Sequence, residues 1–157
     1  MSSSKPGNDP GGDVERTLQL ARRYLRFGAR STAQLRAHLE AHSLPASSIE
    51  DVLAACARRG WLDDAACAKL WVTMLAERGY AWAAIRDQLL TKGLNAGLID
   101  RALQPLHSLA DDERRARQLI QHRLRGRAIR TAQVRAQMAR LLARRGFDRD
   151  LIEQLVQ

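Results

Sequence analysis

The sequence lacks the long apolar runs that mark a membrane protein. No segment approaches the roughly 18 consecutive apolar residues that a membrane-spanning helix needs. The N-terminal residues also lack the apolar stretch of a secretory signal peptide. We therefore expect a soluble, cytoplasmic protein with no membrane partner.

Aromatic residues and cysteines are also scarce. Only 4% of the residues are aromatic although 45% are hydrophobic, in a chain rich in Ala, Leu, Arg and Gln. That composition favours helices, and no β-strand pattern competes with it. The two cysteines, Cys56 and Cys67, lack the spacing of metal ligands. We expect them to be free thiols in a reducing compartment.

The apolar residues repeat with a period of about 50 residues, which indicates stacked modules that are each too small to bury an apolar face alone. Residues 35–49, 85–99 and 138–152 align without gaps, and their apolar positions coincide. One leucine in each segment occupies the same place, and these are Leu39, Leu89 and Leu142. We expect an all-α fold of three tandem three-helix modules in an elongated, curved array, with the three leucines in equivalent buried positions.

Composition and turn-forming residues divide the chain into four segments. Residues 1–12 are small and polar with no apolar anchor, so we expect a disordered tail. Helical modules then occupy residues 13–60, 61–106 and 107–157, and the third module is basic.

Capping patterns predict where the helices begin and end. Ser31 with Gln34 has the capping-box spacing, and Pro45, with Ser47 and Glu50, should open the next helix. A helix-ending glycine separates successive helices at several further places. The other predicted signals are N-caps at Asp63, Asn95 and Asp148 and stops at Gly60, Gly79, Gly93 and Gly146.

Positive charge is concentrated in the third module. Between Arg114 and Arg145 there are 11 arginines and no acidic residue, whereas the other 15 Lys and Arg residues accompany 17 acidic residues. The formal charge of +9 therefore divides into +11 in this segment and −2 elsewhere. A dense run of one sign suits phosphates or an acidic protein surface, and arginine can contact either through two N–H groups. The other interpretation is a solvated face that only maintains solubility.

A helical wheel selects the arginines of this run that point outward when the apolar residues face the core. Arg123 falls near the apolar arc, so either its stem packs against the core or the helix ends before it. The candidate partner-binding and nucleic-acid-binding residues are Arg114, Arg125, Arg140 and Arg144.

Four aromatic residues of the second module lie close together in the sequence. A stacking platform for nucleic-acid bases is one interpretation of Trp61, Trp71, Tyr80 and Trp82. Packing in the core is the favoured one, with Trp71 filling space at a junction of small modules. The exposure of Trp82 stays open, because it lies at the start of a helix.

Signals for catalysis are weak. His38 and His42 have the separation of two zinc ligands on one helical face. Glu40, however, is not at the position that either metalloprotease motif requires. Because the sequence also lacks a Gly-rich phosphate loop, a serine elbow and a Cys-His signature, we expect a binding protein with no catalytic residues, cofactor or metal.

Two segments of the sequence carry recognisable signatures. The first is Gly60-Trp61-Leu62-Asp63-Asp64, continued by Lys92-Gly93-Leu94, and the second is Leu141-Leu142-Ala143-Arg144-Arg145-Gly146-Phe147. Both segments resemble signatures of the RecX family, regulators of the bacterial recombinase RecA. The resemblance covers about residues 15–157, and Cys67 departs from it where the family usually has an aromatic residue.

The resemblance implies a non-enzymatic modulator that binds RecA and its filament on single-stranded DNA and limits filament growth and strand exchange. We expect a monomer, with double-stranded DNA as a second nucleic-acid partner. The basic module would be drawn to phosphates or acidic protein surface with an affinity that falls with salt. The alternatives are a general DNA- or RNA-binding helical protein without a recombinase partner, and a metal hydrolase with zinc at His38 and His42.

Overall fold

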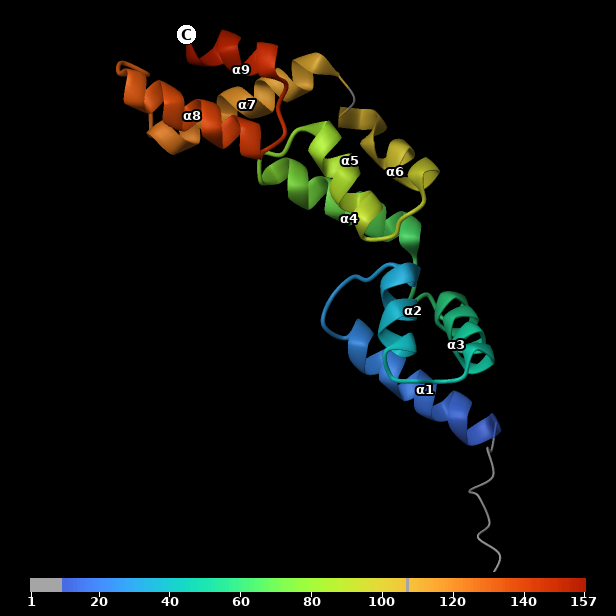
Figure 1. The fold of residues 1–157 in the computed structure, drawn as a ribbon. Helices are drawn as coiled ribbons and strands as arrows, with labels where there is room; N and C mark the ends of the chain where they lie inside the picture. The colour runs from blue at the N-terminus through green and yellow to red at the C-terminus, as the bar shows by residue number, and fades with distance from the viewer. Residues whose placement is uncertain (1–9, 107) are drawn as a thin grey trace, which may run out of the picture. The chain divides into compact units, whose positions relative to one another are not determined.

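The fold is all-α, as the sequence predicts. The computed structural model describes residues 10–106 and 108–157, and in these ranges it contains nine α-helices, one 3-10 helix and no strand (Figure 1). None of the helices in those ranges is long and apolar enough to cross a membrane. The elements are α1 (Pro10–Leu25), α2 (Thr32–Glu40), α3 (Ala46–Arg58), α4 (Asp64–Glu77), α5 (Trp82–Thr91), α6 (Ala96–Leu103), η1 (Gln104–Leu106), α7 (Leu109–Leu124), α8 (Ala132–Arg144) and α9 (Arg149–Val156).

Helix α1 begins earlier than predicted. Residues 1–9 of the expected disordered tail lie outside the described residues, but residues 10–12 form the first turn of α1. The prediction of disorder is therefore wrong for residues 10–12. Proline suits a first helical turn because its fixed φ is helical and the N–H that it lacks would have no partner there. Asp13 then adds negative charge at the positive end of the helix.

The described residues form two compact units. Unit 1 extends to Cys67 and includes Lys92–Leu94, whereas unit 2 consists of Ala68–Thr91 and Asn95–Gln157. Helix α4 therefore begins in unit 1 and continues in unit 2. The predicted modules at residues 13–60, 61–106 and 107–157 stay a prediction. The start of the second repeat and its α5–α6 turn belong to unit 1 together with the first repeat.

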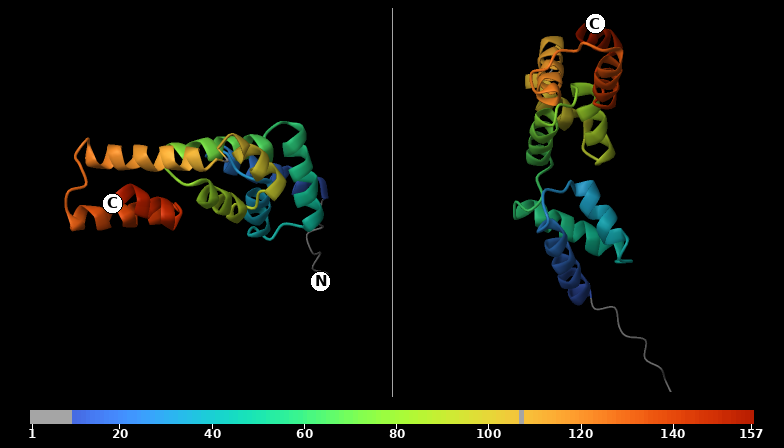
Figure 2. Two further views of the ribbon diagram at one scale, coloured as in Figure 1. Left: turned by 90° about the horizontal axis from the view of Figure 1, so that it is seen from above. Right: turned by 90° about the vertical axis from the view of Figure 1, so that its left-hand side faces the viewer.

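The core of unit 1 lies among α1, α2 and α3, which form one bundle in Figure 1 and in the right-hand view of Figure 2. Leu35 and Leu39 of α2 are fully buried against Val52 and Cys56 of α3 and Ala21 of α1. Their spacing places both leucines on one face of α2. Removal of this apolar surface from water is the main contribution to the stability of the bundle.

The core of unit 2 repeats the same burial pattern. Met138 and Leu142 of α8 pack with Phe147 and Ile152, and helices α7, α8 and α9 enclose them. The three leucines that the alignment makes equivalent have no exposed surface in either unit, which confirms the predicted positions. These residues are Leu39, Leu89 and Leu142.

Most of the predicted helix ends are confirmed. Ser31 and Gln34 form a capping box at the start of α2. Asp63 caps α4, since its Oδ1 accepts the backbone N–H of Ala66 at 2.9 Å. Asn95 and Asp148 cap α6 and α9, and helices end before Gly60, Gly79, Gly93 and Gly146, which have φ values of 69° to 82°.

Helix α3 begins at the predicted place, after Pro45, but without a side-chain cap from Ser47 or Glu50. Pro45 is the N-cap and makes no side-chain hydrogen bond to the first turn. Because α3 already begins at Ala46, Ser47 lies inside the first turn and cannot be the cap. Glu50 instead forms an ion pair with Arg36 of α2.

One joint between successive repeats occurs twice. In unit 1, Oδ1 of Asp64, the first residue of α4, accepts the backbone N–H of Thr32 at 2.8 Å. In unit 2, Oδ1 of Asp112 in the first turn of α7 accepts the backbone N–H of Trp82 at 3.2 Å. Thr32 and Trp82 are the first residues of α2 and α5, whose N–H groups have no partner within the helix. The second and third repeats therefore each supply a carboxylate oxygen that accepts a helix N-terminal N–H of the preceding repeat.

Candidate nucleic-acid interface

Helix α7 begins with an acidic turn that pairs with the first arginines of the basic run. Oγ of the N-cap Ser108 accepts the backbone N–H of Asp111 at 3.0 Å. The hydrogen bond from the Ser108 hydroxyl is the main reason that the pKa of Asp111 lies below its usual value. Acidic residues also favour the positive end of the helix. The ion pairs are Arg114 with Asp111, Arg115 with Asp112 and Arg117 with Glu113.

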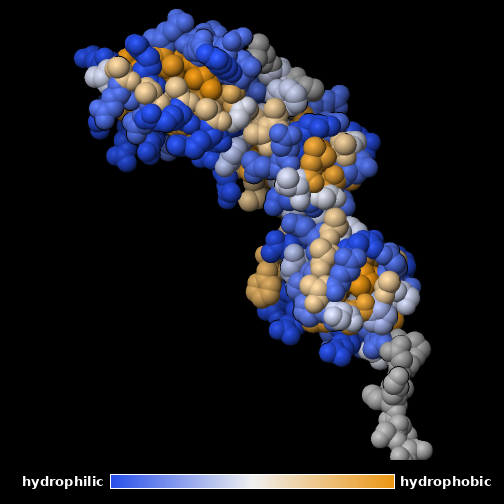
Figure 3. Space-filling model, in the orientation of Figure 1, coloured by the Kyte–Doolittle hydropathy of each residue, from blue (hydrophilic) through white to orange (hydrophobic). Residues whose placement is uncertain are grey.

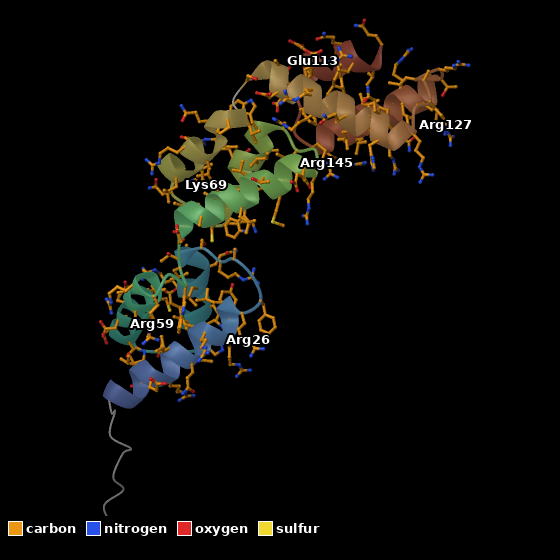
Figure 4. The ribbon with its side chains drawn as sticks, turned by 180° about the vertical axis from the view of Figure 1, so that it is seen from behind. Arg26, Arg59, Lys69, Glu113, Arg127 and Arg145 are labelled. Carbon is orange, nitrogen blue, oxygen red and sulfur yellow. The ribbon has the colours of Figure 1, made fainter. Side chains whose placement is uncertain are left out.

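Seven further arginines are exposed between the last turn of α7 and the end of α8, and none has an ion pair within the described part of the chain. Nitrogen-tipped side chains project outward from this region around Arg127 (Figure 4). The face of unit 2 seen in Figure 3 has hydrophilic residues on both sides of an apolar stripe. We name the surface that the seven exposed arginines form the α7–α8 basic face. Its residues are Arg123, Arg125, Arg127, Arg130, Arg135, Arg140 and Arg144.

The structure places the four predicted contact arginines in two settings. All four are exposed, as the helical wheel predicts, and Arg125, Arg140 and Arg144 belong to the α7–α8 basic face. Arg114 lies near the other end of α7, where its pair with Asp111 reduces the local charge. The binding role of the four residues stays a prediction, and this geometry favours the three of the basic face.

Arg123 does not pack as the sequence predicts. Helix α7 continues past it to Leu124, and the Arg123 side chain is exposed. Leu124 itself is only half-buried, so the core covers this end of α7 incompletely. Arg123 therefore adds its charge to the basic face instead of its stem to the core.

The buried Arg115 was missed by the sequence analysis. Its guanidinium pairs with the buried Asp112, and its Nε donates to the Tyr80 carbonyl oxygen at 3.3 Å. Burial raises the pKa of Asp112 more than the attraction of Arg115 and the N–H of Trp82 lower it. An aspartate one helical turn before the arginine is the signal that could have identified this pair. Arg115 thus fixes α7 to the turn before α5 and is not available to a ligand in the way that the exposed arginines are.

Arg145 is also turned toward the protein. Its guanidinium carbon lies 4.4 Å from the centroid of the Tyr80 ring, a cation–π contact. Its carbonyl oxygen accepts the backbone N–H of Ala81 at 3.0 Å. Of the 11 arginines in the run, three are ion-paired and Arg145 is stacked on a ring, so the other seven carry the exposed charge that has no ion pair within the described residues.

The aromatic residues of the second repeat do not form one platform. Trp71 is buried, which confirms the core interpretation for that residue. Tyr80 and Trp82 are half-buried. For Trp61 the core interpretation is wrong, because this side chain is 37% exposed in the turn after α3.

The histidine pair is placed in the bundle of unit 1. The His38 ring stacks on Tyr24 with centroids 4.1 Å apart, and it is 4.7 Å from the His42 ring. Nδ1 of His42 lies 2.8 Å from the His38 carbonyl oxygen, and burial, followed by the charge of His42, lowers the pKa of His38. In residues 10–106 and 108–157, no three His, Cys, Asp or Glu side chains are grouped so that they could hold a metal ion.

Comparisons with known proteins give one consistent family. A family model described as RecX, second three-helix domain, matches residues 63–103. A regulatory protein RecX from Streptomyces coelicolor is 31% identical over 157 residues, covering 99% of this chain and 83% of that protein. The RecX protein of Thermobifida fusca is 34% identical over 143 residues, covering 90% and 77%. The crystal structure of RecX from Lactobacillus salivarius has a TM-score of 0.72 at 16% identity, covering 94% of this chain and 96% of that one, a likeness of fold alone.

Proposed function

This chain belongs to the RecX family of regulatory proteins, and from that premise we propose that it binds RecA and the RecA filament on single-stranded DNA. Binding limits filament growth and strand exchange. The observation that carries the proposal is the α7–α8 basic face, with seven exposed arginines that lack ion pairs within the described residues.

The basic face supports binding through long-range attraction and through direct contacts. Each arginine that neutralises a phosphate releases condensed counterions, so affinity for DNA falls as salt rises. The planar guanidinium also binds a carboxylate with two hydrogen bonds, so an acidic surface of RecA suits the same face. Both contacts would place this protein against the filament without any reaction.

In this proposal the protein therefore regulates RecA by occupying binding surface on the filament. The relatives bear the description of regulatory proteins, and we expect this chain to have no catalytic activity of its own. A bound molecule blocks the addition of RecA subunits or the access of a second DNA strand. Such inhibition requires no metal, so chelating agents should leave it unchanged.

The test uses purified RecA on single-stranded DNA. Added at sub-stoichiometric ratios, this protein should lower DNA-dependent ATP hydrolysis and strand exchange. A pull-down of RecA with and without single-stranded DNA measures whether the filament is the preferred partner. If RecA activity is unchanged at equimolar protein while an oligonucleotide still binds, the chain is a general nucleic-acid-binding protein and the RecA proposal fails.

A further inference from the structure

Unit 1 leaves two aromatic side chains accessible in neighbouring helix-ending turns. Phe27 is 79% exposed in the turn after α1, and Trp61 is 37% exposed in the turn after α3. Helices α1 and α3 are in extensive contact within the bundle. A single exposed apolar residue needs no explanation, but these two accompany a cavity and an excess of arginine.

The cavity, which we name the Trp61 groove, has a volume of about 290 Å³. Its walls are Arg22, Leu25, Arg26 and Trp61. The guanidinium carbons of Arg22 and Arg59 lie 6.0 and 5.0 Å from the centroid of the Trp61 ring. Figure 4 labels Arg26 and Arg59, which directly follow α1 and α3, the two helices that meet here.

The turn that carries Trp61 is held in place by the backbone. Gly60 has a φ of 69°, and the N–H groups of Trp61 and Leu62 both donate to the Cys56 carbonyl oxygen, at 2.9 and 3.3 Å. Leu62 is buried in the core of the bundle. The exposed indole therefore stands on a fixed support, so little conformational entropy is lost when a ligand contacts it.

Positive charge predominates at the helix ends beside the groove, and the exposed Asp63 follows Trp61 by two residues. Five exposed arginines lie in the last turns of α1 and α3 or directly after them, and within the described residues none has an ion pair. Cations near a helix C-terminus interact favourably with the helix dipole. This interaction explains the arginines but not the accessible aromatic rings between them. The five residues are Arg22, Arg23, Arg26, Arg58 and Arg59.

We propose that the Trp61 groove binds a short stretch of single-stranded nucleic acid. Bases stack on Trp61 and on Phe27, which directly follows the groove residue Arg26, while Arg22, Arg26 and Arg59 contact the phosphates on either side. A single strand offers flat aromatic bases and negatively charged phosphates in regular alternation. Aromatic rings can stack on the bases, and the guanidinium groups on either side of the rings can bind the phosphates. An acidic peptide offers the charge without the stacking faces.

This inference adds a contact surface in unit 1 to the basic face of unit 2. It rests on the proposed function only in requiring that the chain meets single-stranded DNA. Stacking is tolerant of sequence because every base has an aromatic face. The groove therefore suits a regulator that acts along a strand of any sequence.

The experiment follows tryptophan fluorescence of the full chain during titration with a thymidine oligonucleotide of about 15 nucleotides, near the upper site size of small single-strand-binding domains. Trp61 is the most exposed of the three tryptophans, since Trp71 is buried and Trp82 half-buried. We expect quenching that disappears in Trp61→Phe although the oligonucleotide still binds. Phe27→Ala should weaken binding about ten-fold, and Phe27→Tyr, which keeps a ring, should bind as the wild type.

Leu70→Ala is the matched control, because Leu70 is a 48% exposed apolar residue of unit 2. Phe27 is so exposed that its replacement leaves folding intact, which a melting curve checks. The inference is overturned if the oligonucleotide causes no quenching and Phe27→Ala binds like the wild type. It is equally overturned if poly-glutamate quenches Trp61 and displaces the oligonucleotide from it, which would identify an acidic protein partner. Inhibition of RecA, measured in parallel, reports separately on the proposed function.

Discussion

Gly146 approaches Ala84 so closely that a Cβ atom on the glycine would lie 2.4 Å from the Cβ of the alanine. Gly93 has the same relationship with Ala33, also at 2.4 Å. In both cases the turn between the second and third helices of one repeat contacts the first turn of the second helix in the preceding repeat. Glycine is required at these turns by a positive φ and also by the close approach.

Gly146→Ala should therefore lower the free energy of unfolding more than Gly60→Ala does. Both glycines have positive φ, but an added Cβ at Gly60 meets no atom within 4 Å. The left-handed backbone alone costs about 1–2 kcal/mol, and overpacking at Gly146 should add about 1–3 kcal/mol. Urea denaturation of the two variants measures the difference, and equal losses would show that the Ala84 contact is unimportant.

Leu89→Ala should lower the free energy of unfolding by about 2–5 kcal/mol, as removal of a buried leucine does. The next residue supplies the control, because Leu90 is 39% exposed whereas Leu89 is fully buried. Leu90→Ala should change stability by about 0.5 kcal/mol or less. Similar unfolding curves for the two variants would contradict the repeated burial pattern.

Asp112→Ala should be far more destabilising than Glu113→Ala. Burial raises the pKa of Asp112, so attraction to Arg115 does not fully offset the cost of burying the charge. Loss of the aspartate leaves Arg115 buried without its partner, which costs about 3–5 kcal/mol. Glu113 pairs with the exposed Arg117, and such surface pairs contribute about 1 kcal/mol or less.

A second substitution checks the cause of the Asp112 effect. Adding Arg115→Met to Asp112→Ala removes the unpaired charge and should recover much of the lost stability. Thermal or urea unfolding of the single and double variants measures this recovery. A double variant that is no more stable than Asp112→Ala would mean that the aspartate acts through its hydrogen bond to the Trp82 N–H.

Arg140→Ala with Arg144→Ala should weaken binding to single-stranded DNA and flatten its salt dependence. The slope of log affinity against log salt should fall by about 0.7 for each phosphate of a single strand that the variant no longer neutralises. Stability should stay within about 0.5 kcal/mol, since both side chains are exposed. Fluorescence anisotropy of a labelled oligonucleotide at several salt concentrations measures both the affinity and the slope.

Arg78→Ala with Arg101→Ala is the matched control for this pair. Both arginines are exposed outside the α7–α8 basic face, so the net charge changes equally. If the two double variants lose the same affinity for DNA, the net charge of the protein determines that affinity and the position of the arginines does not. Arg114→Ala should have a smaller effect than Arg125→Ala, because Asp111 already pairs with Arg114.

Cys56 and Cys67 should react slowly with thiol reagents in the folded protein. Burial raises the pKa of both thiols, and the charges of Asp64 and Asp63 raise that of Cys67 further, so the reactive thiolate is rare. The neutral thiols contribute their full stabilisation at pH values below the pKa of cysteine in the unfolded chain, about 8.5. This stabilisation is lost as the pH rises through the raised pKa of the thiols in the folded protein. Absorbance assays with a disulfide reagent, with and without denaturant, measure the protection. Rapid labelling of both cysteines without denaturant would contradict it.

The sequence by itself determined the features that depend on neighbouring residues along the chain. The register of Leu39, Leu89 and Leu142 follows from helical periodicity, and the caps at Ser31 and Asn95 follow from hydrogen bonds within one turn. The concentration of positive charge in residues 114–145 is also evident from the sequence, because it depends only on which residues that segment contains.

Only the tertiary structure decided which side chains meet across the fold. Arg115 and Arg114 are adjacent in the sequence, yet one is buried against the Tyr80 turn and the other faces solvent. Trp61 and Trp71 are both tryptophans of one repeat, but only Trp71 is enclosed by core residues. These outcomes depend on residues 30 or more positions away, as in the hydrogen bond from Trp82 to Asp112. Local periodicity carries no information on such contacts, because they form only when separate helices pack together.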